Sequence, residues 1–204
     1  MFNVWNCHDF NFGAKMINIY DFDKTIYNGD SSIDFYKFCI SKNKRCLLII
    51  PKTAIQLFLY KIKIINKEKF KSTFFSFVKY FDNLEPLIEE FWDINIRKIK
   101  KFYMEKKQST DYIISASPEF LLKTIALRLN FNLIATNVNI KTGEIIGKNC
   151  YGKEKVNRLK KLGISNCNEF YSDSKSDLPL RKIANRGYIV KKNKIVLWDV
   201  NKLQ

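Results

Sequence analysis

The sequence has a single histidine, His8, in 204 residues. A zinc site built on several imidazoles is therefore excluded, and a Ser-His-Asp triad would have to use this one residue. Residues 1–15 lack a basic start followed by an apolar run, so we expect no signal peptide. His8 lies in this segment, and we expect it to be a surface histidine without a functional role. Met16 directly precedes the first strand-like run. Residues 1–15 are therefore either a short extension or a segment upstream of a start at Met16.

The cysteines are too scattered for a disulfide framework, and glycine and proline are too few for a low-complexity chain. The five cysteines form no C-x-x-C pair, which predicts free thiols in a reducing compartment and hence a cytoplasmic protein. Glycine and proline number seven and four, too few for a low-complexity chain. No apolar run reaches the roughly 20 residues that a membrane span needs. The most apolar window, residues 46–60, is interrupted by Pro51, Lys52 and Gln56.

Acidic residues are scarce beside basic ones. Lysine and arginine total 36 and aspartate and glutamate 20, a net charge of +16, which favours anionic partners such as phosphates or an anionic membrane. Only six of the basic residues are arginine, the residue that reads bases in DNA grooves, so we expect no specific nucleic-acid partner. Apolar residues make up 46% of the chain, enough for a folded core.

The apolar pattern changes twice along the chain. From about residue 33 to 107 apolar residues recur at three- and four-residue spacing without glycine, which predicts helices, one of them N-capped by Asp82 or Asn83. Outside this block strands alternate with helices, and residues 141–143 form a turn. The predicted strands are residues 16–20, 111–115, 131–135, 169–172, 188–190 and 195–198, and the predicted helices are 118–129, with Pro118 first, 153–162 and 178–185. This alternation predicts a parallel α/β core interrupted by a helical insertion.

Four acidic residues follow two of the predicted strands. Asp21 and Asp23 stand where the first strand ends, and Asp173 and Asp177 follow the strand that ends at residue 172. In an open parallel sheet these ends border the crevice where ligands bind. Carboxylates this close repel one another, and a hard cation such as Mg²⁺ is the usual means of keeping them ionised. A capping and a turn aspartate would explain Asp21 and Asp23 equally well on their own.

Two further residues suit an anionic ligand. Ser115 ends a predicted strand and precedes a helix, so its hydroxyl and the adjacent amide of Ala116 form an anion cradle. Lys155 lies in the first turn of a predicted helix, where a cation opposes the helix dipole. An anionic ligand explains a lysine at this position better than helix stability does, although either residue alone has an ordinary structural explanation.

Together these features resemble the four motifs of the haloacid dehalogenase superfamily of phosphohydrolases. The matching segments are DFDKT (21–25), IISASPEF (113–120), NCYGKEKV (149–156) and YSDSKSD (171–177), and the resemblance covers residues 16–200. Three segments, SASPEF (115–120), YGKEKV (151–156) and SDSKSDLPL (172–180), are most similar to the phosphoserine-phosphatase-like branch of this superfamily and, within it, to phosphatidylglycerophosphate phosphatases. Ser172 stands where many relatives have a glycine before the last acidic motif. This difference should alter the flexibility of the loop more than the ligation of a metal.

The resemblance implies a Rossmann-like, doubly wound parallel core at residues 1–30 and 108–204 and an inserted all-helical C1-type cap at 31–107. It implies a Mg²⁺-dependent phosphomonoester hydrolase in which Asp21 attacks phosphorus and Asp23 is the general acid and base. Mg²⁺ would be held by Asp21, the Asp23 carbonyl and Asp173, with Asp177 in support. Ser115, Ala116 and Lys155 would bind the phosphoryl oxygens.

The substrate is expected to be a phosphorylated small molecule or a lipid phosphate. Asp30, nine residues after Asp21, matches a substrate-facing acidic position of phosphoserine phosphatases, and a turn residue is the equal alternative. Arg45 is a candidate clamp for an amino-acid substrate. A basic membrane- or nucleic-acid-binding protein with a vestigial site remains the second functional class.

Two features of the insertion allow other interpretations. Cys39 and Arg45 have the C-x5-R spacing of cysteine-dependent phosphatases, but the loop lacks glycine and the context is helical, so we expect no catalytic Cys39. Residues 46–60 are apolar and lysines follow them, as in a segment that binds peripherally to an anionic membrane, here at its inner surface. The same run can instead be the core of the insertion, with solvated lysines, and the sequence favours this alternative because a small helical insertion must bury apolar surface.

Overall fold

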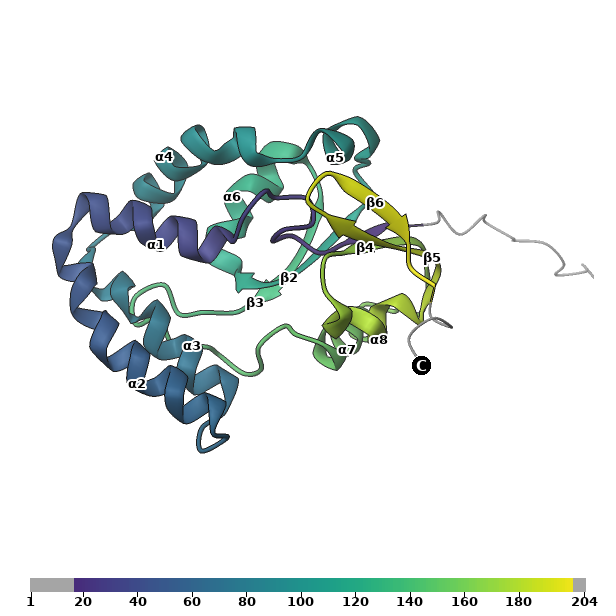
Figure 1. The fold of residues 1–204 in the computed structure, drawn as a ribbon. Helices are drawn as coiled ribbons and strands as arrows, with labels where there is room; N and C mark the ends of the chain where they lie inside the picture. Colours follow the sequence, from purple (N-terminus) through teal and green to yellow (C-terminus); the bar gives the residue numbers. More distant parts are fainter. Residues whose placement is uncertain (1–16, 200–204) are drawn as a thin grey trace, which may run out of the picture.

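The computed structural model describes residues 17–199. Its centre is a six-stranded sheet in the order β3-β2-β1-β4-β5-β6, parallel except for β6, which runs antiparallel to β5 (Figure 1). The strands are β1 (Ile19–Tyr20), β2 (Tyr112–Pro118), β3 (Asn132–Thr136), β4 (Cys167–Ser172), β5 (Ala184–Lys191) and β6 (Lys194–Leu197). The predicted α/β fold with a mostly parallel sheet is confirmed. His8, Met16 and the N-terminal extension lie outside the described residues.

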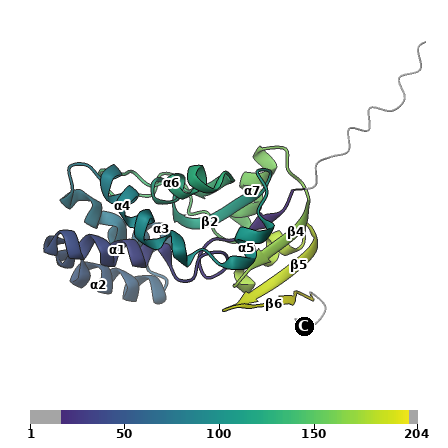
Figure 2. The same cartoon turned by 90° about the horizontal axis from the view of Figure 1, so that it is seen from above.

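The helices fall into two groups. Between β1 and β2 the chain forms α1 (Ser31–Lys42), α2 (Ile50–Lys61), α3 (Lys67–Phe75), α4 (Glu85–Asn95) and α5 (Lys101–Lys106), with short 3-10 helices at Lys44–Ile49, Ser76–Tyr80 and Ile96–Lys98. The later helices are α6 (Glu119–Leu129), α7 (Lys153–Lys161) and α8 (Leu178–Arg181). In Figures 1 and 2, α1 to α4 lie together beside the sheet, as expected for a helical insertion. None of the helices within residues 17–199 has the length and apolarity to cross a bilayer.

Side chains that alternate along the strands supply two separate cores. Tyr20 and Ile113 face a large cluster that includes α6 and the helical insertion. Ile19, Ile114 and Phe170 face the opposite way, into a smaller cluster with α7 and α8. Because successive residues of a strand point to opposite faces, three short strands are enough to bury helices on both sides of the sheet.

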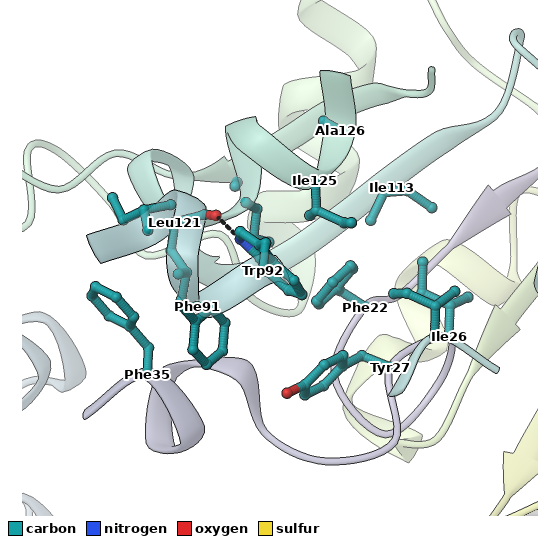
Figure 3. Close-up of a cluster of buried hydrophobic side chains, with 14 of the residues drawn as sticks. Phe22, Ile26, Tyr27, Phe35, Phe91, Trp92, Ile113, Leu121, Ile125 and Ala126 are labelled. Carbon is teal, nitrogen blue, oxygen red and sulfur yellow. Dashed lines mark hydrogen bonds between the residues drawn. The ribbon is translucent and has the colours of Figure 1, made fainter. Parts of the chain in front are cut away.

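The large cluster joins the helical insertion to the sheet. Trp92 of α4 is fully buried, and its indole N–H donates to the Leu121 carbonyl of α6 at 2.7 Å (Figure 3). Phe22, in the loop directly after β1, packs edge-on against Trp92 at 5.9 Å between ring centroids. The loop after β1 is therefore held between the sheet and α4, which limits how far its aspartates can move.

Gly143 ties the loop after β3 to the insertion. It has φ of +76°, and a Cβ at this position would lie 2.4 Å from the backbone of Phe75. Only glycine tolerates both this backbone conformation and this approach. The predicted turn at residues 141–143 thus packs directly on the end of α3.

Among the predicted element boundaries that differ from the structure are the starts of two helices and the end of a third. β2 continues past Ser115 to Pro118, which is extended (ψ 135°) and precedes α6, so Pro118 is not the first helical residue. Helix α8 ends at Arg181 rather than 185, because residues from Ala184 onward pair with β4. The N-cap of helix α4 is Leu84, without a side-chain cap hydrogen bond, so the prediction of Asp82 or Asn83 as N-cap is wrong, although Asn83 Oδ1 accepts from the Glu85 N–H at 3.0 Å. At Pro118 and at Ala184, strand pairing in the sheet overrides the local helix preference.

Replacing Trp92 by alanine is expected to lower the free energy of unfolding by about 3–5 kcal/mol, because it empties a site between α4, α6 and the loop after β1. Trp92→Phe keeps part of the packing but leaves the Leu121 carbonyl without its donor, so its loss should be smaller. Urea unfolding measures both. Leu127→Ala, at a 75% exposed position of α6, should change stability by less than about 0.5 kcal/mol. Equal losses at the two positions would contradict the packing described here.

Candidate active site

A cavity of about 380 Å³ lies where β1, β2 and β4 end. Asp21 follows β1 and Asp173 follows β4, while Ala116 and Ser117 belong to the last part of β2. Because these neighbouring strands are parallel, their carboxyl ends meet at one edge. β2 and β4 flank β1 on opposite sides, and such a switch point in strand order is where open α/β sheets bind ligands.

At the floor of the cavity Lys155 binds two carboxylates. Its ammonium donates to Asp21 Oδ1 at 2.7 Å and to Asp177 Oδ2 at 2.8 Å, and all three side chains are buried or nearly so. Lys155 reaches this point because it lies in the first turn of α7, which begins directly after Gly152 at the cavity wall. The ion pair joins β1, α7 and the loop after β4.

The charges in this group do not balance. Burial lowers the pKa of Lys155, but the ion pairs with Asp21 and Asp177 outweigh it and raise the pKa above its ordinary value. Burial also raises the pKa of Asp21, and the nearby Asp177 and Asp23 raise it further, although Lys155 opposes the shift. One cation cannot compensate several buried carboxylates, so the lysine stays charged while Asp21 still gains proton affinity.

Asp23 is held by donors from two other elements. Its Oδ1 accepts from the Ser31 N–H at the start of α1 at 2.6 Å, and its Oδ2 accepts from the Ser117 hydroxyl at 2.5 Å. Burial raises the pKa of Asp23, as does the charge of Asp30, and these two hydrogen bonds oppose the shift. Ser117 was not identified from the sequence. Its position two residues after Ser115 on an extended strand, which places both on one face, was the available signal.

Thr25 and Ser172 position the remaining aspartates. The Thr25 hydroxyl donates to Asp21 Oδ2 at 3.3 Å and accepts from the Asp173 N–H at 2.9 Å, so it links the ends of β1 and β4. The Ser172 hydroxyl donates to Asp177 Oδ2 at 2.9 Å. The serine that replaces the usual glycine therefore contacts the acidic group directly, a role that the sequence did not reveal.

The carboxylates match the donor chemistry of a hard cation. Asp177 Oδ1 is buried and has no hydrogen-bond partner, and Asp173 is half-buried at the cavity wall. Within residues 17–199 no three histidine, cysteine or acidic side chains are grouped as a metal site. The carboxylates of Asp21 and Asp173, which both line the cavity, are the groups available to hold a cation there together with backbone oxygen.

Of the other predicted site residues, two line the cavity and two do not. Ala116 and Asp30 line the cavity, and Asp30 is also the N-cap of α1, accepting from the Ile33 N–H at 3.1 Å. Ser115 is buried behind the lining, where its hydroxyl accepts from the Ser117 N–H. Arg45 is not brought to the cavity. It is exposed in the 3-10 helix that follows α1, because α1 carries the chain away from the strand ends.

Two lysines of α3, which the sequence analysis placed only among the lysines that follow the apolar run, also line the cavity. Lys71 donates to the Ala116 carbonyl and to Asn149 Oδ1, and burial, with the charge of Lys67, lowers its pKa to about 8. Lys67 lies over the Tyr151 ring, 3.2 Å from its centroid. Their i,i+4 spacing places them on one face of the helix. The sequence alone did not show that this face is turned toward the strand ends.

The alternative cysteine-dependent site is absent. Cys39 is buried within α1, and burial raises the pKa of its thiol, the opposite of what a nucleophilic thiolate requires. The four cysteines within the described residues are free and buried, as expected from their spacing. Cys7 lies outside that part of the chain.

Comparisons with known proteins agree with this geometry. A model of the haloacid dehalogenase-like hydrolase family matches residues 19–182. Among solved structures, a protein of unknown function from Bordetella pertussis Tohama I has a TM-score of 0.69 at 20% identity, covering 84% of this chain and 87% of its own. A phosphoserine phosphohydrolase-like protein from Francisella tularensis has a TM-score of 0.56 at 16% identity, covering 84% and 85%.

A third structure, described as a phospho-aspartyl intermediate analogue of phosphoserine phosphatase, has a TM-score of 0.54 at 18% identity and covers 85% of each chain. At these identities the structures establish the fold alone. No curated protein sequence matches the chain significantly. The family match covers most of the chain, including the strand-end aspartates Asp21 and Asp173 and the buried Lys155, and on this basis the chain belongs to the haloacid dehalogenase-like hydrolase family.

Proposed function

We propose that the chain is a Mg²⁺-dependent phosphomonoester hydrolase that works through an aspartyl-phosphate on Asp21. The observation that carries this proposal is the contact between Asp21 and Lys155 at the end of β1. Two residues further on, Asp23 is held by other donors, the Ser31 N–H and the Ser117 hydroxyl. A nucleophile, a cation for the phosphoryl oxygens and a second carboxyl group are thereby assembled in one cavity. Two solved structures with a similar fold are described as phosphoserine phosphatases, which is in accord with the proposal.

In the first step a carboxylate oxygen of Asp21 attacks phosphorus and the bond to the ester oxygen breaks. Asp23 donates its proton to that leaving oxygen, a role that suits a carboxyl group whose pKa burial raises. In the second step Asp23 takes a proton from water, the water oxygen attacks phosphorus, and Asp21 is released with inorganic phosphate. Lys155 neutralises the phosphoryl oxygens throughout, and the end of β2 at Ala116 supplies backbone donors.

We assign Mg²⁺ to the carboxylates of Asp21 and Asp173 and the carbonyl of Asp23, with Asp177 in support. When bound, the ion would neutralise charge that develops on the transferring phosphoryl group. Ser172 and Lys155 orient Asp177, and Thr25 fixes the spacing between Asp21 and the loop that carries Asp173. Ser115, buried behind the lining, is a positioning residue for the Ser117 N–H.

We further propose that residues 31–107 act as a cap over this cavity, with the core at 1–30 and 108–204. Helix α3 contributes Lys67, Phe70 and Lys71 to the lining, and Asp30 stands at the N-terminus of α1. The lysines suit an anionic substrate, while Asp30 suits a polar or cationic group on it. The substrate class is a phosphorylated small molecule or a lipid headgroup phosphate.

The nucleophile is tested by hydrolysis of p-nitrophenyl phosphate and of an alkyl phosphate. Asp21→Asn should abolish turnover of both, because an amide does not attack phosphorus. Asp23→Asn should still form phosphoenzyme from p-nitrophenyl phosphate, whose leaving group needs no proton, and should fail with the alkyl phosphate. Near-wild-type turnover of the alkyl phosphate by either variant would contradict the assignment. Absence of metal-dependent hydrolysis in the wild type would favour the vestigial-site alternative.

Lys155 has a matched control in Lys153, which is exposed in the same helix turn. Lys155→Met should lower turnover by about two orders of magnitude or more at saturating metal, because it removes a charge aimed at the transferring group. Lys153→Met should leave turnover unchanged. If the two results were exchanged, Lys153 would be the phosphate-binding lysine and the contact described here would have no catalytic meaning.

Chelation of the metal should abolish turnover, and added Mg²⁺ should restore it. Asp173→Ala should raise the Mg²⁺ concentration needed for half-maximal activity by about tenfold or more, because it removes a hard oxygen ligand. Asp82→Ala, at an exposed aspartate of the insertion, is the control and should not shift that concentration. An unchanged metal titration in Asp173→Ala would remove this residue from the metal site.

A further inference from the structure

Helix α2 presents its apolar side chains to solvent. Seven of its twelve residues are apolar, yet none of the twelve is buried. Leu48, Ile55, Phe58 and Ile62 follow one another at helical spacing and are 67%, 60%, 61% and 48% exposed. In both Figure 1 and Figure 2, α2 lies at the margin of the molecule, with other helices on one side of it only.

The inner face of the same helix carries two buried polar groups that have no partner. Thr53 and Gln56 lie toward the rest of the insertion, and the Thr53 hydroxyl and the Gln56 side-chain carbonyl are buried without a hydrogen-bond partner. Tyr60 stacks on Phe70 of α3 and anchors this side. A helix that faced water would gain by the reverse arrangement, because buried polar groups without partners and exposed apolar groups both cost free energy.

The exposure is concentrated in one segment of the chain. Of the eighteen large apolar side chains that are exposed within residues 17–199, eight lie between positions 47 and 64, and two of these, Ile50 and Leu57, line the groove beneath α2. Soluble monomers seldom leave so much apolar surface uncovered on one short segment. The run at residues 46–60 is therefore not simply the core of the insertion, which was the alternative that the sequence favoured.

The segment that carries these apolar residues has charges of one sign. Between Asp34 and Glu68 the chain has eight basic residues and no acidic one. Lys44, Lys52, Lys61 and Lys63 are exposed along and beyond the two ends of α2. A second copy of this chain that paired this segment about a two-fold axis would bring lysines against lysines, which disfavours that occupant. An apolar stripe bordered by lysines fits a surface that is apolar inside and anionic outside.

We propose that the outer face of α2, together with residues 47–48 and 62–64, docks on an anionic lipid bilayer. The apolar stripe would lie among the upper acyl carbons, while the lysines extend to the phosphates of the headgroups. This inference does not depend on the proposed function. It has one consequence for that function, because a groove of about 240 Å³ under α2 shares Phe70 and Phe74 with the cavity of the site. A docked α2 would therefore hold the site close to the lipid.

Co-sedimentation of the full chain with vesicles tests the proposal. We expect binding to vesicles of phosphatidylcholine and phosphatidylglycerol at low salt, weaker binding at high salt, and little binding to phosphatidylcholine alone. Ile55→Ser combined with Phe58→Ser should weaken binding to the anionic vesicles at least tenfold. Lys52→Gln and Lys61→Gln should each weaken it about fivefold.

Matched controls lie on the far helices. Leu127→Ser, at an exposed apolar position of α6, and Lys160→Gln, at an exposed lysine of α7, should bind as the wild type does. Circular dichroism establishes that each variant is folded. A variant that keeps a large aromatic side chain at position 58 gives an independent measurement. Tryptophan emission of Phe58→Trp should shift to shorter wavelength on anionic vesicles, while that of Leu127→Trp should not.

Three results would overturn the proposal. The first is folded wild-type protein that stays in the supernatant with anionic vesicles at low salt. The second is binding that the lysine variants weaken but the Ile55 and Phe58 variants do not, since this would be charge attraction without insertion. The third is a wild-type protein that does not bind vesicles but forms a dimer, and that Phe58→Ser converts to a monomer. This result would assign the apolar face of α2 to a second copy of the chain.

Discussion

The arrangement of the site depends on the ion pairs of Lys155. This lysine contacts Asp21 after β1 and Asp177 after β4, and it arrives from α7, so three segments far apart in the sequence meet at one ammonium group. Removing a charge from such a buried group would leave its partners uncompensated, which is more costly than never having formed the pair. The surrounding donors therefore act together: Thr25 and Ser172 hold the two carboxylates that Lys155 bridges.

The same contacts explain why the two aspartates of DFDKT can act differently although they are two residues apart. Asp21 faces the lysine and a second carboxylate, whereas Asp23 faces the Ser31 N–H and the Ser117 hydroxyl. Burial raises the pKa of both carboxyl groups, but the group that opposes this shift differs between them. For Asp21 it is the charged Lys155 of α7, and for Asp23 it is the neutral donors at the start of α1 and the end of β2.

The helical insertion has two faces with separate consequences. Toward the sheet, Trp92 and Phe22 hold the loop that carries the aspartates, and α3 brings Lys67 and Lys71 to the cavity. Away from the sheet, α2 leaves Ile55 and Phe58 exposed. The same insertion therefore lines the cavity with α3 and carries the apolar, basic face of α2. Docking through that face would keep the cavity near the lipid surface.

Much of this was determined by the sequence alone: the α/β fold, the helical insertion and the aspartates at the strand ends. These follow from apolar periodicity and from the geometry of parallel strands, whose carboxyl ends meet at one edge. Packing between distant segments decided the rest. Periodicity defines the faces of a helix but not what each face meets, so only the tertiary structure placed Lys71 in the cavity, left Arg45 outside it and turned Phe58 to solvent. Ser117 and Ser172 likewise acquire their roles from partners that folding brings to them.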